Sequence, residues 1–156
     1  MDIRNLCISP NNELIKKSIF KIVSECKAND GGIYPKAKIS DVCINGMFLN
    51  YASYFQTDEN YLKSVVDCLL SEKMLDGGFN CRSNRSGAHH SSLHTTLSVL
   101  EGFTEYDKNG YQYRLGDVKN AVQSSPEFIL KHQLFLSDRI GDIIHKDFLK
   151  FSYPRR

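Results

Sequence analysis

The sequence predicts an all-α domain made of stacked helical pairs. The run Asp76-Gly77-Gly78-Phe79 has a weaker counterpart, Asp30-Gly31-Gly32-Ile33-Tyr34, about 46 residues earlier, and repeats of this length are typical of stacked helical units. Elsewhere, apolar residues recur at the spacing of a helix. No segment alternates convincingly between apolar and polar residues with a period of two, so we expect no substantial sheet.

The first helix is expected from Asn11 to Lys27. Its apolar side chains recur at i, i+4, i+7, i+8 and i+11, which places them on one face: Ile15, Ile19, Ile22, Val23 and Cys26. Asn11 or Asn12 can cap the exposed amides of the first turn. Gly31-Gly32 ends the helix, because glycine tolerates the positive φ that helix exits commonly need.

The next two helices differ in how their apolar residues are distributed. The segment from Ser40 to Phe55 is apolar or aromatic around most of its circumference, which is typical of a helix buried on more than one side. The segment from Glu59 to Lys73, capped by Asp58, carries one apolar stripe: Leu62, Val65, Val66, Leu69 and Leu70. We therefore expect an inner helix followed by an outer one.

Two further helices are expected after the second glycine turn. The fourth begins near His90 and ends near Tyr106. The fifth starts at Asp117, and Pro126 is expected to kink or break it, because proline costs about 3 kcal/mol inside a helix but suits a first turn. The remaining segment, 138–156, is expected to be an irregular tail.

Length and charge narrow the class of protein. A chain of 156 residues with 41% hydrophobic and 24% charged residues suits a single soluble domain covering 1–156. The net charge of +2 comes with no basic stripe, so nucleic acid is not expected as a partner. No apolar run approaches the roughly 20 residues of a membrane span, and the N-terminus lacks the features of a signal peptide. These observations favour a cytoplasmic protein.

The cysteines are expected to be free thiols. There are five of them, an odd number, widely spaced and without a C-x-x-C pair. Three lie in apolar helical segments, where free cysteine behaves as a small buried hydrophobe. We expect structural thiols in a reducing compartment rather than disulfides or a zinc knuckle.

The second glycine turn and the histidine run after it resemble a known group of repeats. Asp76-Gly77-Gly78-Phe79-Asn80-Cys81, together with the run from His90 through His94-Thr95-Thr96 to Gly102, is similar to the repeats of squalene cyclases and protein prenyltransferases. It is more closely similar to uncharacterised bacterial members of that α/α-toroid superfamily. The tail from Phe148 to Arg155 is similar to theirs as well, and the resemblance covers most of the chain from Glu13.

The resemblance implies an inner and an outer ring of helices around a central cavity, with active sites on the cavity wall. The helices expected here make roughly half of such a ring, so the chain is either a shortened relative or a fragment of a longer toroid protein. An open half-ring would expose its inner apolar helix, and large exposed apolar patches signal partners. A homodimer, or association with a missing C-terminal half, is therefore expected.

Two motifs of that superfamily are missing or altered. The Asp-x-Asp-Asp run, with which squalene cyclases donate a proton, does not occur in the sequence. The prenyltransferase zinc site uses an Asp, a Cys and a distant His, and Asp76, Cys81 and His94 offer these types at a spacing that does not match. The resemblance thus favours a prenyltransferase- or cyclase-like scaffold for an apolar or prenyl-type ligand, with no cofactor or catalytic residue assigned. The alternative is a non-catalytic interaction module or an incomplete fragment.

Candidate site residues lie on the fourth expected helix. On a helical wheel His90, His94 and Glu101 share one face, and two histidines at i, i+4 can hold one zinc ion. Glu101 is roughly 10 Å beyond His94 along the axis, too far to coordinate the same ion. Three interpretations stay open: hydrogen bonds to loop backbones at the rim of the helix stack, a polar site on the cavity wall, and a metal site.

The second glycine turn supplies the remaining candidates. Asp76 is expected to accept hydrogen bonds from the amides of its own turn, since Asp30 has the same place in the first repeat; a catalytic role is the alternative. The candidate ligand-binding residues of the turn have no counterpart there: Asn80, Cys81, Arg82 and Arg85. The two arginines could hold a pyrophosphate, because guanidinium forks match its oxygens. Five aromatic residues could line an isoprenoid cavity, or form plain core: Tyr51, Tyr54, Phe55, Phe79 and Phe103.

Overall fold

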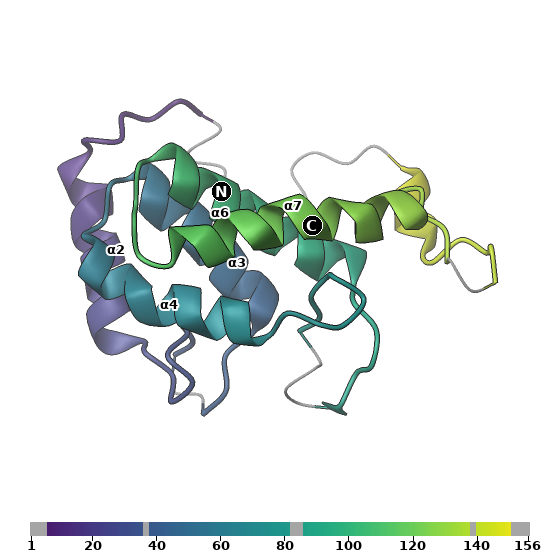
Figure 1. The fold of residues 1–156 in the computed structure, drawn as a ribbon. Coiled ribbons are helices and arrows are strands. Elements are labelled where there is room, and N and C mark those ends of the chain that lie inside the picture. The colour runs from purple at the N-terminus through teal and green to yellow at the C-terminus, as the bar shows by residue number, and fades with distance from the viewer. Residues whose placement is uncertain (1–5, 36–37, 82–85, 138–139, 151–156) are drawn as a thin grey trace.

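The computed structural model describes residues 6–35, 38–81, 86–137 and 140–150 (Figure 1). Every regular element in these ranges is a helix: α2 (Glu13–Glu25), α3 (Val42–Tyr54), α4 (Glu59–Ser71), α6 (Leu93–Lys108), α7 (Leu115–Lys131) and the short 3-10 helix η1 (Lys146–Leu149). Within the same ranges, extended pairing is limited to two isolated bridges, Lys27 with Ile33 and Leu136 with Ile143. The predicted all-α class is confirmed.

Side-chain caps fix the start of two outer helices where the sequence predicted them. The Asn12 side chain accepts hydrogen bonds from the first-turn amides of α2, and Asp58 accepts one from the Asn60 amide at the start of α4. Each cap satisfies a backbone donor that would otherwise lack a partner in the helix. The observed ends of α2, α3 and α4 lie within about two residues of the predicted ones, the usual uncertainty of a helix end.

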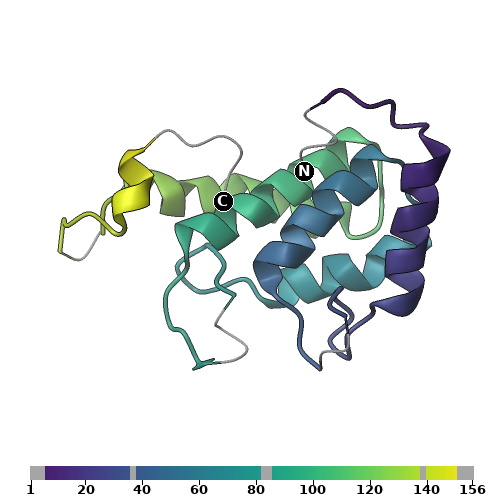
Figure 2. The same ribbon diagram turned by 180° about the vertical axis from the view of Figure 1, so that it is seen from behind.

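The core is centred on α3 and α6, which pack side by side (Figures 1 and 2). Their backbones approach so closely that a Cβ on Gly46 would lie 2.6 Å from the carbonyl oxygen of Ser98. A Cβ on Gly102 would lie 2.5 Å from the carbonyl oxygen of Gly46. Only glycine permits such contact, because any side chain would separate the two helices.

The other helices cover this central pair with one buried face each. On α4 the buried residues form the stripe seen in the sequence: Leu62, Val65, Val66, Cys68 and Leu69. On α3 buried residues occur around most of the circumference, so the predicted contrast between an inner and an outer helix is confirmed. Phe55, Phe79 and Phe103 are at most 2% exposed, which confirms the interpretation of these rings as plain core.

Of the kink or break predicted at Pro126, the break is wrong. Helix α7 continues through this proline, which removes one helical hydrogen bond at a cost of about 3 kcal/mol. Burial on both sides of the proline outweighs that cost, since Val118, Ala121 and Phe128 all lie on the buried face of α7, which packs against α6. The following residues are irregular as expected, apart from η1, in the part of the tail that the structure describes.

Candidate functional site

The second glycine turn is stabilised by the carboxylate of Asp76. Its Oδ1 accepts the Gly78 amide at 3.4 Å and the Ser91 hydroxyl, and its Oδ2 accepts the Ser91 amide at 2.8 Å. In the first repeat, Asp30 accepts the Gly32 amide at 3.0 Å and the Ser40 amide at 2.6 Å. The prediction that these aspartates bond to their own turns is confirmed, and each also reaches a serine just before the next helix.

These hydrogen bonds stabilise the ionised form of Asp76. Burial opposes ionisation of the carboxyl, but the bonds from the Ser91 hydroxyl, the Ser91 amide and the Gly78 amide outweigh it. The net effect lowers the pKa of Asp76 below its ordinary value. Asp76 therefore carries a negative charge at neutral pH.

A second pair of polar residues, which the sequence reasoning missed, joins each turn to the following helix. Asn45 on α3 accepts the Ile33 amide at 2.6 Å, and Thr96 on α6 accepts the Phe79 amide at 2.9 Å. Both lie five residues after the serine that the aspartate binds, as the printed sequence shows. This common spacing, rather than residue identity, was the signal that could have revealed them.

Helix α6 begins later than the sequence predicted, and this separates the histidines. It starts at Leu93, because Ser91 is held by Asp76 and the Ser92 amide donates to the Phe79 carbonyl at 2.8 Å. His90 therefore precedes the helix, and the expected shared face of His90, His94 and Glu101 is wrong. His94 is exposed on the first turn of α6, and Glu101 is half-buried further along it.

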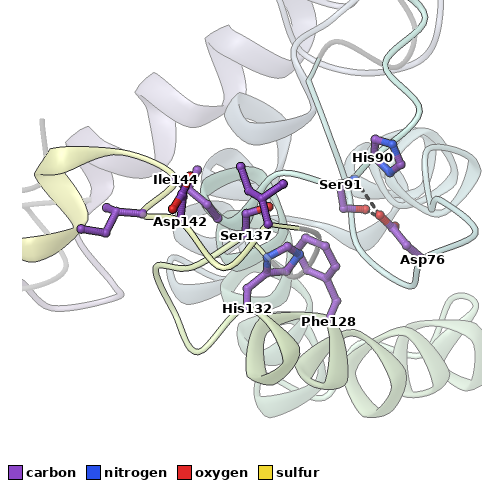
Figure 3. A pocket seen from close by; sticks show the side chains of 10 residues that line it. Asp76, His90, Ser91, Phe128, His132, Ser137, Asp142 and Ile144 are labelled. Atoms are coloured by element: carbon purple, nitrogen blue, oxygen red, sulfur yellow. Dashed lines mark hydrogen bonds between the residues drawn. The ribbon is translucent and has the colours of Figure 1, made fainter.

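A pocket of about 290 Å³ lies between the second glycine turn and the C-terminal end of α7 (Figure 3). Asp76, His90 and Ser91 contribute to it from the turn, and Phe128 and His132 contribute from α7 and its end. The following segment completes the described lining with two polar and three apolar side chains: Ser137, Ile140, Asp142, Ile143 and Ile144. Of the predicted site residues that the structure describes, this pocket brings together Asp76 and His90.

His132 is a pocket residue that the sequence reasoning missed. It caps the C-terminus of α7, is 9% exposed and makes an edge contact with Phe128, with ring centroids 4.5 Å apart. Its Nδ1 lies 2.7 Å from the Leu136 carbonyl oxygen, which can only accept, so Nδ1 is the donor. The i, i+4 spacing of an aromatic and a histidine at a helix end was the available signal.

The remaining candidates that the structure describes lie outside the pocket. The Asn80 side chain donates to the His90 carbonyl at 2.6 Å and so connects the turn to the segment before α6. The Cys81 sulfur accepts the Cys43 amide at the start of α3. Arg82 and Arg85, the predicted pyrophosphate ligands, lie outside the described residues. Among the residues that are described, no three His, Cys, Asp or Glu side chains gather so that they could hold a metal ion.

Comparisons with protein-family models, curated proteins and solved structures found no match for this chain. The toroid resemblance therefore stays a prediction. The structure itself shows packed helical pairs and two equivalent turns. No helix in the described part of the chain is long and apolar enough to cross a membrane.

Proposed function

We propose that the chain is a ligand-binding domain on a prenyltransferase- or cyclase-like helical scaffold, and that its pocket holds a short prenyl-type ligand with a hydroxyl head group. The observation that carries this proposal is the mixed lining of the pocket. Phe128, Ile143 and Ile144 offer apolar surface, while Asp76 and Ser91 offer polar groups beside it. Such a combination is typical of small-molecule sites, where apolar walls supply affinity and a few polar groups fix orientation.

The size of the pocket limits the length of the ligand. Its volume of about 290 Å³ is at the lower end of the range for small-molecule sites, which is about 300–1,000 Å³. One or two isoprene units suit this space, whereas a long polyisoprenoid would extend into solvent. The proposal is therefore for a short-chain ligand.

The charge of the lining favours a neutral head group over a diphosphate. Asp76 is ionised at neutral pH, Asp142 is a second carboxyl residue, and no lysine or arginine belongs to the described lining. A diphosphate would meet repulsion from these carboxyl groups, and the described lining offers no cation to compensate it. An alcohol can instead donate a hydrogen bond to a carboxylate oxygen, and such charge-assisted bonds are the stronger ones.

A calorimetric titration with geraniol and with geranyl diphosphate tests this proposal. We expect geraniol to bind at least about tenfold more tightly than the diphosphate, a difference of roughly 1.4 kcal/mol. Replacing Ile143→Asp should abolish binding, because it places a charge in the apolar part of the pocket. The matched control is Ile44→Asp on α3, since Ile44 and Ile143 are 37% and 46% exposed and Ile44 is outside the pocket.

The same titration can contradict the proposal. Binding that is lost in Ile44→Asp but retained in Ile143→Asp would place the ligand on the surface of α3 instead. Tight binding of the diphosphate with none of the alcohol would overturn the argument from charge. An absence of binding by either compound would favour the second candidate, an interaction module, which the exposed apolar side chains at the C-terminal end of the molecule support.

A further inference from the structure

Two cysteines from different repeats meet at the start of α3. The Cys81 sulfur, just after the second glycine turn, accepts the backbone amide of Cys43 at 3.0 Å. The Thr95 hydroxyl, in the first turn of α6, lies 3.5 Å from the same sulfur. The Cys81 sulfur thus receives donors from the first turns of both central helices.

The position of Cys81 is fixed by its neighbours in the chain. Phe79, two residues earlier, is fully buried. Its amide donates to the Thr96 hydroxyl, and its carbonyl accepts the Ser92 amide. Cys81 is therefore held against α3, whose N-cap residue Asp41 makes no side-chain cap hydrogen bond. The sulfur occupies the place of such a cap, where the helix dipole favours a negative charge.

The two sulfurs differ in their protonation. Hydrogen bonding from the Cys43 thiol, followed by the bonds from Thr95 and the Cys43 amide, outweighs burial and the nearby Asp41 charge and lowers the pKa of Cys81 to about 6. The same thiol–sulfur bond, with burial, raises the pKa of Cys43. At neutral pH the pair is thus one thiolate beside one thiol, and both residues are half-buried rather than enclosed.

We propose that Cys43 and Cys81 are a redox-active pair that closes a reversible disulfide when a hydroperoxide oxidises it. The Cys81 thiolate attacks the terminal oxygen of the hydroperoxide, so that an S–O bond forms and the O–O bond breaks. The departing alkoxide or hydroxide takes up a proton, and Cys81 is left as a sulfenic acid. The Cys43 thiol then gives up its proton as its sulfur attacks that of Cys81, and the oxygen leaves as water. The peroxide gains two electrons, one from each sulfur.

The other cysteines lack this arrangement. Cys7 is exposed, Cys26 is half-buried near the end of α2, and Cys68 is buried on α4 beside the Ser40 hydroxyl. Burial raises the pKa of Cys68, which keeps it a thiol. The proposed disulfide would therefore form selectively, and it would join the start of α3 in the first repeat to the loop after the second turn. It does not depend on the ligand proposed for the pocket.

Peptide mapping after oxidation tests the pair directly. The folded full-length chain is treated with stoichiometric hydrogen peroxide, its remaining thiols are alkylated, and the unreduced digest is analysed by mass spectrometry. We expect a Cys43–Cys81 cross-linked peptide, lighter than its two thiol peptides by two hydrogen atoms, which dithiothreitol converts back to them. Its yield should exceed that of any other cysteine pairing at least about tenfold, because the Cys81 sulfur is hydrogen-bonded to the amide of Cys43 in the folded chain.

Matched variants separate the proposed chemistry from simple exposure. Thr95→Val, which removes one donor to the Cys81 sulfur, should slow cross-linking several-fold, while Thr104→Val on the exposed face of α6 should leave the rate unchanged. Cys43→Ser should leave Cys81 oxidised to sulfenic acid without a cross-link. The chain unfolded in urea, oxidised in the same way, shows the pairings expected without a fold. The proposal is overturned if the native chain gives the same mixed pairings, or if its Cys81 is oxidised without forming a disulfide with Cys43.

Discussion

At the scale of single residues, Asp30 and Asp76 show why the turns begin with aspartate. Each carboxylate accepts the amide of the second glycine and the amide of a serine just before the next helix. Both oxygens of a carboxylate are acceptors, so one side chain can satisfy two backbone donors at once. Asparagine offers a single acceptor oxygen, and its amide nitrogen would face one of those donors.

We therefore expect Asp76→Asn to destabilise the fold. The loss of a charge-assisted hydrogen bond would be reduced by solvent at this accessible position, which suggests about 1 kcal/mol in the free energy of unfolding. Urea denaturation of both proteins measures the difference. Asp147→Asn on the exposed η1 is the control and should change stability by less than about 0.5 kcal/mol. Equal stability of the wild type and Asp76→Asn would contradict this role of the carboxylate.

The same carboxylate predicts a dependence of stability on pH. Because the pKa of Asp76 is lower in the folded than in the unfolded chain, its contribution is fully present above the unfolded value, about 4. As the pH falls below that value the unfolded chain takes up the proton first, and the contribution is lost. The stability difference between wild type and Asp76→Asn should stay constant from neutral pH to about 5 and shrink below about 4. A stability difference that grows as the pH falls would mean that folding raises the pKa of Asp76 instead of lowering it.

The residue-scale features were predictable where they lie within one repeat and unpredictable where they join repeats. Asp76 was identified because its turn has a copy in the same sequence. The contact between Cys43 and Cys81 spans 38 residues and depends on how α3 packs beside the second turn, which no local pattern encodes. The pocket has the same origin, because His132 reaches it only through the packing of α7.

At the scale of elements, the close crossing of α3 and α6 requires glycine at positions 46 and 102. Gly46→Ala or Gly102→Ala should destabilise by about 3 kcal/mol or more, since each new methyl group would overlap a backbone carbonyl that cannot move aside. The control is Gly116→Ala in α7, where an added Cβ meets nothing within 4 Å. That variant should be stabilised by roughly 0.5–1 kcal/mol, because alanine favours a helix.

Thermal unfolding of the three glycine variants measures these effects. The two variants at the crossing should lower the midpoint, and Gly116→Ala should raise it slightly. Wild-type stability in both Gly46→Ala and Gly102→Ala would mean that the helices cross elsewhere. A stability loss in Gly116→Ala of the same size would mean that glycine is needed throughout the helices rather than at the contact.

Helix identity was largely predictable from the sequence, whereas two helix boundaries were not. Periodicity and caps placed α2, α3 and α4 because these signals are local. The start of α6 was placed too early because Asp76, remote in sequence, holds Ser91 outside the helix. The kink or break at Pro126 was predicted from local cost alone, whereas α7 continues through this proline, packed against α6.

At the scale of the whole molecule, apolar side chains are exposed at one end. The C-terminal segment lies at the far end of α7, on the opposite side of the molecule from α2 (Figure 2). This end, comprising α7 from Leu130 onward and the described part of the following segment, exposes seven large apolar side chains: Leu130, Leu134, Ile140, Ile143, Ile144, Phe148 and Leu149. Such a concentration is unusual for the surface of a monomer and is typical of an interaction site.

The predicted homodimer would be explained by contact between these ends of two molecules. We expect sedimentation velocity to show association that increases with protein concentration. Leu134→Glu combined with Leu149→Glu should weaken it by about tenfold or more, because each charge would have to be buried in an apolar contact. Leu14→Glu combined with Leu75→Glu is the matched control, since both leucines are at least 76% exposed but lie elsewhere. A monomer at every concentration, or equal association of both double variants, would remove the C-terminal end as the interface.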